Sequence, residues 1–305
     1  MLSKFWESTG EGIAGQWLQY IFGPAFLFWG GGLIIIVFQL GFYNVWNWIS
    51  SRDVPTQVAA LLIGLFVLLV SSKLMEQLRF GFLRLLEGYW TWPLSYLISP
   101  LTNLQKWFIE QDRKYWNTLM DKLEKGNLSP VEKRELARLE SNGHYAPADL
   151  DDCLPTILGN VLQSAESTPR HRYGLDAVIC WPRLWLLLSK EVQDAMNSAR
   201  QSLDTLVELW AWGLLFLIWA FWWPGAILIA IAWMIVAYIL AVQSARKYAD
   251  LLESAFDLYR WSLYESVRWD VPRKSGEDEI MAGRQLTEFL WRGTSEFPVR
   301  YKKDK

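Results

Sequence analysis

Two long stretches without any charged residue constrain this chain more than any other feature. The first lies between Glu11 and Arg52, and the second lies between Glu208 and Arg246. A third, shorter uncharged run covers residues 54–72. The hydrocarbon core of a bilayer rejects ionised side chains and unpaired backbone groups, so such stretches predict membrane-spanning helices. We therefore expect an all-α membrane protein.

The lengths of these stretches predict four transmembrane helices in two hairpins. Residues 22–49 and 54–72 are separated only by a short linker, so they must be antiparallel. The block that follows Glu208 is too long for one crossing at about 1.5 Å per residue. The sequence FWWPG supplies a turn, because Pro224 cannot continue a helical hydrogen-bond ladder and Gly225 tolerates unusual dihedrals. The alternative is one kinked helix and one buried helix.

The basic residues predict the orientation of the hairpins. The first hairpin turn contains one basic residue, Arg52, and the second contains none. By the positive-inside rule the opposite side is cytoplasmic, which places both termini in the cytoplasm and the chain in the plasma (inner) membrane. The expected domains are a first segment and hairpin (1–75), a helical cytoplasmic domain with membrane-surface segments (76–205), a second hairpin (206–245) and a cytoplasmic extension and tail (246–305).

Helical patterns continue through the polar part of the chain. Ser129, Pro130 and Glu132 form an N-cap, a first-turn proline and a capping-box carboxylate, and this helix should end near 142–143. Apolar stripes with intervals of three and four extend the second hairpin on both sides. Further helices are expected at 101–123, 155–166 and 277–291.

Two aromatic segments are candidates for the membrane surface. Residues 83–98 are broken by Pro93 and begin with charged residues, and residues 181–188 have the sequence WPRLWLLL. Such segments favour an interfacial position. Burial in a cytoplasmic core is the alternative for each.

Composition narrows the classes of function. The 20 Trp favour membrane interfaces, and a net charge of −2 argues against nucleic acid as a partner. Cys153 and Cys180 do not indicate a disulfide framework, and His144 and His171 lie too far apart in sequence to indicate a metal site. We recognise no catalytic motif, so neither an enzyme nor a cofactor is expected.

Polar and glycine residues in the first predicted span are candidates for a pore and for helix packing. Gln39, Tyr43 and Asn47 recur at intervals of four and would share one face of a continuous helix. That stripe could line a pore, and interhelical hydrogen bonding is the alternative. The run Gly30, Gly31 and Gly32 favours close helix packing, with helix bending as the alternative. Pro224 and Gly225 are the corresponding hinge candidates in the second hairpin.

A basic cluster follows Pro169 in the polar part of the chain. Arg170, His171 and Arg172 could hold a phosphate or a lipid headgroup through charge-assisted hydrogen bonds. The alternatives are a solvated loop and salt bridges to acidic residues at 149–152.

The phrases PTILGNVLQSAE, YGLDAVICWPRLW and DLYRWSLYESVRW resemble those of uncharacterised bacterial multi-spanning membrane proteins. In topology the chain is similar to bestrophin-type anion channels, without matching motifs. The polar stripe of the first span, the glycine run and the extended amphipathic helices predict an oligomeric channel or pore-like assembly, here a homo-oligomer in a lipid bilayer that is gated from the cytoplasm. The alternative is a membrane-anchored scaffold or sensor that recruits a soluble cytoplasmic protein.

Overall fold

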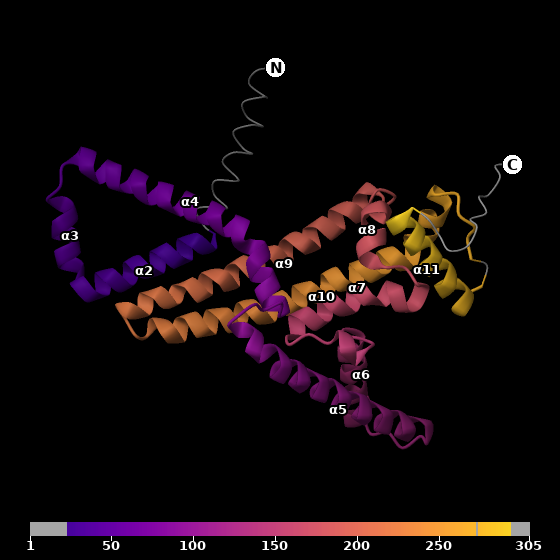
Figure 1. Ribbon diagram of the computed structural model, residues 1–305. Helices are drawn as coiled ribbons and strands as arrows, with labels where there is room; N and C mark the ends of the chain where they lie inside the picture. Colours follow the sequence, from indigo (N-terminus) through magenta and orange to yellow (C-terminus); the bar gives the residue numbers. More distant parts are fainter. Residues whose placement is uncertain (1–22, 273, 294–305) are drawn as a thin grey trace. The chain divides into compact units, whose positions relative to one another are not determined.

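The computed structural model describes residues 23–272 and 274–293, and this part of the chain is helical with no strand (Figure 1). Its elements are α2 (Pro24–Leu40), α3 (Phe42–Ser50), α4 (Val54–Glu87), the 3-10 helix η1 (Leu94–Leu97), α5 (Ile98–Glu124), α6 (Pro130–His144), η2 (Leu150–Asp152), α7 (Ile157–Tyr173), α8 (Ala177–Trp185), α9 (Lys190–Phe216), η3 (Leu217–Phe221), α10 (Ala226–Ser266) and α11 (Glu277–Arg292). The predicted all-α class is confirmed.

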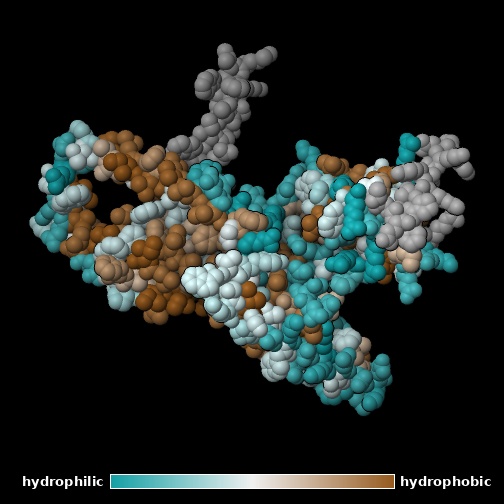
Figure 2. All heavy atoms as spheres, viewed as in Figure 1, coloured by the Kyte–Doolittle hydropathy of each residue, from teal (hydrophilic) through white to brown (hydrophobic). Residues whose placement is uncertain are grey.

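The chain forms two compact units. In the described residues the first unit contains 23–83 and 204–240, and the second contains 84–203 and 241–293. We call them the apolar unit and the polar unit. The helices α4, α9 and α10 each begin in one unit and end in the other. Figure 2 shows hydrophobic residues covering α2 and α4 of the apolar unit and hydrophilic residues covering much of α5 and α6 of the polar unit.

The prediction of one unbroken helix over residues 22–49 is wrong. The helix breaks at Gly41, which has φ +82°, and α2 and α3 meet at a bend of 103°. Positive φ is strained for residues with a side chain, so glycine is the residue that permits this break without strain. The amide of Gly41 caps α2 through the carbonyl of Val37. By length and composition the pair is a candidate for a broken span or a re-entrant segment.

The second hairpin turns where the sequence predicted. The 3-10 helix η3 follows directly after α9. Residues 222–225 form the turn, and α10 begins at Ala226. Close packing joins the two arms within the apolar unit: the rings of Phe216 and Trp233 lie 5.7 Å apart, and a Cβ at Gly213 would lie 3.1 Å from Met234. The small residue at 213 therefore permits the close approach of α9 and α10.

Three helices are long and apolar enough to cross a membrane: α4, α9 with η3, and α10. A fourth crossing results if α2 and α3 together count as one span. Only 11% of the apolar window of α4 is buried within the chain. Such a large exposed apolar surface is costly in water, so these helices are consistent with a membrane protein.

An aromatic core holds the apolar unit together. Phe28 of α2 packs against Trp212, Phe216 and Trp219 from the other hairpin, with ring centroids 5.1–6.3 Å apart. The glycine run predicted for packing lies at this contact. A Cβ at Gly32 would collide with the buried indole of Trp219, so the missing side chain makes room for that ring.

In the polar unit, α6 begins as predicted. The Ser129 hydroxyl accepts a hydrogen bond from the Glu132 amide, and the Glu132 carboxylate accepts one from the Ser129 amide. This capping box satisfies two backbone donors at the helix start. Helix α6 folds against α5 around a small core of Leu119, Leu136 and Leu139.

The two predicted surface segments differ in burial. The side chains of Trp92 and Tyr96 are 76% and 75% exposed, so burial in a core is wrong for this part of segment 83–98. In segment 181–188, Leu184 and Leu188 are buried whereas Leu186 is exposed. Segment 181–188, which includes the end of α8, is thus partly buried in the polar unit.

Candidate functional site

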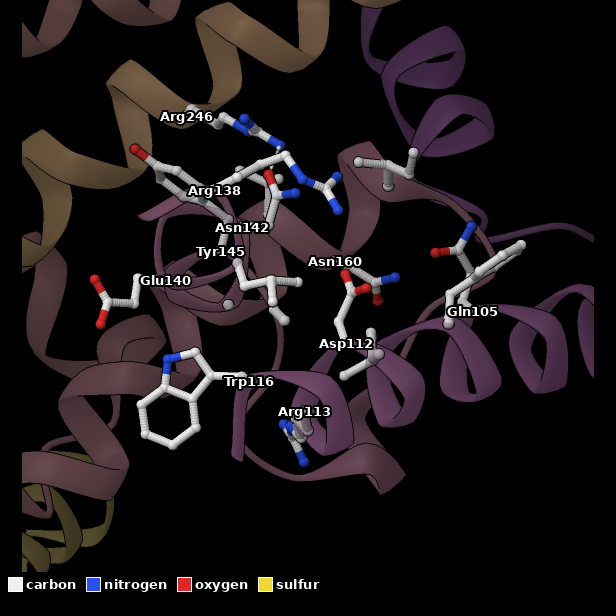
Figure 3. A pocket seen from close by; sticks show the side chains of 17 residues that line it. Gln105, Asp112, Arg113, Trp116, Arg138, Glu140, Asn142, Tyr145, Asn160 and Arg246 are labelled. Carbon is white, nitrogen blue, oxygen red and sulfur yellow. Dashed lines mark hydrogen bonds between the residues drawn. The ribbon is translucent and has the colours of Figure 1, made fainter. Parts of the chain in front are cut away.

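The candidate site is a cavity of about 720 Å³ in the polar unit. Its walls come from α5, α6, the first turns of α7 and one residue of α10, Arg246 (Figure 3). This volume lies in the range of small-molecule sites, which is roughly 300–1,000 Å³. The cavity therefore has room for a small molecule or for part of a lipid.

Apolar side chains form a continuous part of the cavity wall. They are contributed by α5, α6 and α7 and include Phe108, Ile109, Leu139, Ile157 and Val161. Phe108 is 51% exposed at its edge, whereas Val161 is buried at 1%. The apolar wall therefore extends from the protein surface into the interior of the polar unit.

Arg246 supplies a cation with few partners to this cavity. Its Nη2 donates a long hydrogen bond of 3.4 Å to Oδ1 of Asn142, and its guanidinium lies 4.9 Å from the centre of the Tyr145 ring. The buried Nε atom has no hydrogen-bond partner, and within residues 23–272 and 274–293 no carboxylate lies within 4.0 Å of the guanidinium. An arginine has five N–H donors, and within the described residues one of those of Arg246 makes a hydrogen bond.

Tyr145 provides a fixed ring beneath that guanidinium. Its hydroxyl donates a 3.0 Å hydrogen bond to Oδ2 of Asp250, and the Nε2 atom of His144 lies 3.5 Å from the same carboxylate. Burial, followed by the hydrogen bond and the charge of Asp250, raises the pKa of Tyr145. The phenol therefore stays protonated at neutral pH and holds its ring against Arg246.

Arg113 and Asn160, which also line the cavity, are engaged with the protein itself. Arg113 Nη2 donates to the carbonyls of Pro147 and Ala148 at 2.6 and 3.2 Å. Oδ1 of Asn160 accepts a 2.7 Å hydrogen bond from the Leu154 amide. These bonds fix the loop between α6 and α7. Asp112 and Asn160 extend toward the middle of the cavity (Figure 3).

The predicted stripe of Gln39, Tyr43 and Asn47 does not share one helix face. The bend at Gly41 puts Gln39 on α2 and the other two residues on α3. The Gln39 amide nitrogen donates a 3.1 Å hydrogen bond to the carbonyl of Trp222, in the turn of the second hairpin. For Gln39 alone, this bond to the other hairpin is of the kind that the sequence left as the alternative. Pore lining by the three residues stays a prediction.

Of the other glycine and proline candidates, Gly31 lies at a packing contact and Pro224 and Gly225 lie in a turn, whereas Gly30 does neither. A Cβ at Gly31 would lie 2.8 Å from Phe216, whereas a Cβ at Gly30 would meet nothing within 4 Å. Only Gly31 and Gly32 of the run are therefore packed. Pro224 and Gly225 lie in the turn between η3 and α10.

The basic cluster at 170–172 lies in the last turn of α7, so the alternative of a solvated loop is wrong. The three side chains do not converge. His171 lies 3.9 Å from Asp152, while Arg172 lies 3.7 Å from the buried Glu253 of α10. Cations are favourable at a helix C-terminus, which gives this cluster a local structural role. Headgroup binding by it stays a prediction.

Sequence reasoning missed most of the cavity. The signal for Arg246 was visible, because this is the first charged residue after the long apolar block. Its partners Asn142 and Tyr145 precede it by about a hundred residues, and no local pattern links them. No family model, no curated protein and no solved structure matches this chain, so the chemistry of the site rests on its own geometry.

Proposed function

We propose that the chain is a membrane-anchored sensor or scaffold of the plasma (inner) membrane. The apolar unit crosses the bilayer in up to four passes and anchors the polar unit on the cytoplasmic side. The observation that carries this proposal is the cavity of the polar unit, which combines an apolar wall with the underused cation of Arg246. A preformed cavity of this kind is typical of a ligand-binding domain.

The distribution of charge supports the membrane part of the proposal. In the described part of the apolar unit, Arg52 and Asp53 lie at the first hairpin turn. The other charged residues of this unit lie at 73–79 and at 204–208. On α4 the stretch from Val54 to Ser72 would span about 28 Å at ~1.5 Å per residue, close to the thickness of a hydrocarbon core.

Exposed aromatic side chains support a membrane-surface segment in the polar unit. Trp92, Tyr96 and Trp107 are exposed although their rings are largely apolar. Tryptophan and tyrosine favour the interface between headgroups and hydrocarbon, so we place η1 and the first half of α5 there.

Membrane insertion and orientation are tested by labelling. In a variant with Cys153 and Cys180 replaced by alanine, single cysteines are introduced at Ser51, in the first turn, and at Ser275, before α11. In sealed right-side-out vesicles an impermeant maleimide should label the Ser51→Cys protein and spare the Ser275→Cys protein until the vesicles are opened. Labelling of both, or release of the chain by alkaline carbonate, would contradict the anchored arrangement.

An oligomeric channel gated from the cytoplasm is the second candidate. The observation that favours it is the exposure of α4, whose apolar window is 11% buried and could pack against a second copy of the chain. The two proposals differ in ion flux. Purified protein in liposomes should pass small ions if it forms a pore. It should leave the liposomes tight, and carry a specific cytoplasmic partner through purification, if it is an anchor.

A further inference from the structure

We infer that the cavity of the polar unit binds an anionic amphiphile, a molecule with one phosphate or carboxylate group and an acyl chain. The inference rests on the proposed membrane attachment for the source of the ligand, and on the cavity alone for the binding chemistry. It names the chemical class of ligand that the proposed sensor binds.

The cation at the cavity specifies the charge of the ligand. Arg246 has one long hydrogen bond, to Asn142, and no ion pair within residues 23–272 and 274–293. Tyr145, held by Asp250, stacks against one face of the guanidinium. A guanidinium that is fixed in this way can present its remaining donors to an oxyanion, which accepts charge-assisted hydrogen bonds from planar N–H groups.

Asp112 limits how much negative charge the ligand can carry. Its side chain extends toward the middle of the same cavity (Figure 3). Like charges repel, so a polyphosphate that filled the cavity would be disfavoured beside this exposed carboxylate. One anionic group near Arg246, with an uncharged remainder, avoids that repulsion.

The apolar wall specifies the rest of the ligand. Ile109, Ile157 and Val161 offer hydrocarbon contacts, and burial of methylene groups against them is favourable at about 0.8 kcal/mol per CH₂ group. A flexible acyl chain can adapt its conformation to the uneven surface of this wall.

The edge of the cavity indicates the membrane as the source. Gln105 and Phe108 line the cavity from α5, and the neighbouring Leu104 and Trp107 are exposed on the same helix. This part of α5 belongs to the segment that we place at the membrane interface. An amphiphile could therefore enter directly from the headgroup region.

The test uses the purified full-length chain in an uncharged detergent. Dioctanoyl phosphatidic acid, laurate and uncharged dioctanoylglycerol are titrated by calorimetry. We expect saturable binding of the two anionic probes, and their relative affinity separates a phospholipid from a free fatty acid as the source. Arg246→Gln should weaken binding by about tenfold or more. Arg134→Gln should leave it unchanged, because this exposed arginine of α6 lies outside the cavity.

A second variant keeps the test decisive if Arg246→Gln fails to fold. Gly143 lines the cavity, and a Cβ there would meet nothing within 4 Å, so Gly143→Trp adds a large side chain to open space. It should abolish binding and leave the melting temperature unchanged. Equal binding of dioctanoylglycerol, or undiminished binding by a folded Arg246→Gln or Gly143→Trp protein, would overturn the inference. A protein that inserts into membranes and binds neither probe contradicts this inference and leaves the anchor proposal standing.

Discussion

The hydroxyl of Tyr173 donates a 2.5 Å hydrogen bond to Oδ1 of Asp257, and the same geometry recurs between Tyr145 and Asp250. The two carboxylates are seven residues apart on α10 and so lie on one face of this helix. Each tyrosine stands at or just beyond the end of its own helix, α7 or α6. Two helix ends are thus fastened to α10 by the same kind of bond.

Replacing either tyrosine by phenylalanine should destabilise the polar unit. Tyr173→Phe removes a charge-assisted donor and leaves the Asp257 carboxylate with fewer partners, which we expect to cost about 1 kcal/mol. The bond between Tyr145 and Asp250 is longer, at 3.0 Å, so Tyr145→Phe should cost less. Thermal melting in detergent, followed by circular dichroism, measures both. A larger loss for Tyr145→Phe would contradict this order.

The same bonds predict a dependence of stability on alkaline pH. Burial, and next the hydrogen bond to an aspartate, raises the pKa of both tyrosines above their ordinary value near 10. The folded chain therefore retains protons that the unfolded chain releases. This contribution is complete below about pH 10 and is lost as the pH rises through the folded pKa values. Melting temperatures should fall less steeply above pH 10 in the double phenylalanine variant than in the unmodified chain.

Arg79 should be important for joining α4 to α9 in the apolar unit. Its Nη1 lies 3.1 Å from Glu208 and its Nε lies 3.6 Å from Asp204, and both carboxylates are largely buried. Arg79→Gln would remove the cation that faces both carboxylates, so we expect a loss of roughly 1–3 kcal/mol after allowance for partial exposure. Arg292→Gln, which breaks an exposed pair with Glu288, is the matched control and should change the melting temperature little.

Local signals account for what the sequence predicted well. The capping box at Ser129 and the turn after Trp223 depend on residues a few positions apart, and both are present in the structure. The length and polarity of the apolar blocks likewise require no knowledge of tertiary contacts. Helix starts, turns and candidate spans were therefore predictable.

The features that sequence reasoning missed depend on distant contacts or on backbone geometry. Gly41 lies within an apolar stretch, and nothing around it shows that its φ is positive rather than helical. The contact of Arg246 with Asn142 joins residues 104 positions apart. The cavity exists because α5, α6, α7 and α10 meet there, so a single sequence could not predict it.

Cys180 should be unreactive in the folded protein. The residue is fully buried between α8 and α11, where its sulfur lies 3.8 Å from the hydroxyl of Thr287, and burial raises its thiol pKa to about 11. The thiolate is the reactive form, and little of it exists at pH 8. In a Cys153→Ala variant, maleimide labelling at pH 8 should be slow until denaturant is added. Rapid labelling of the folded protein would show that α8 opens readily.

The glycine run in α2 offers a matched pair of substitutions. Gly32→Ala places a Cβ against the buried indole of Trp219, and overpacking of this kind costs typically 1–3 kcal/mol. Gly30→Ala meets nothing within 4 Å and improves helix propensity, so it should be neutral or slightly stabilising. Gly32→Ala should lower the melting temperature and change the intrinsic tryptophan fluorescence. Gly30→Ala should leave the fluorescence unchanged and the melting temperature unchanged or slightly higher. Equal effects of the two substitutions would mean that Trp219 does not pack against α2 as described.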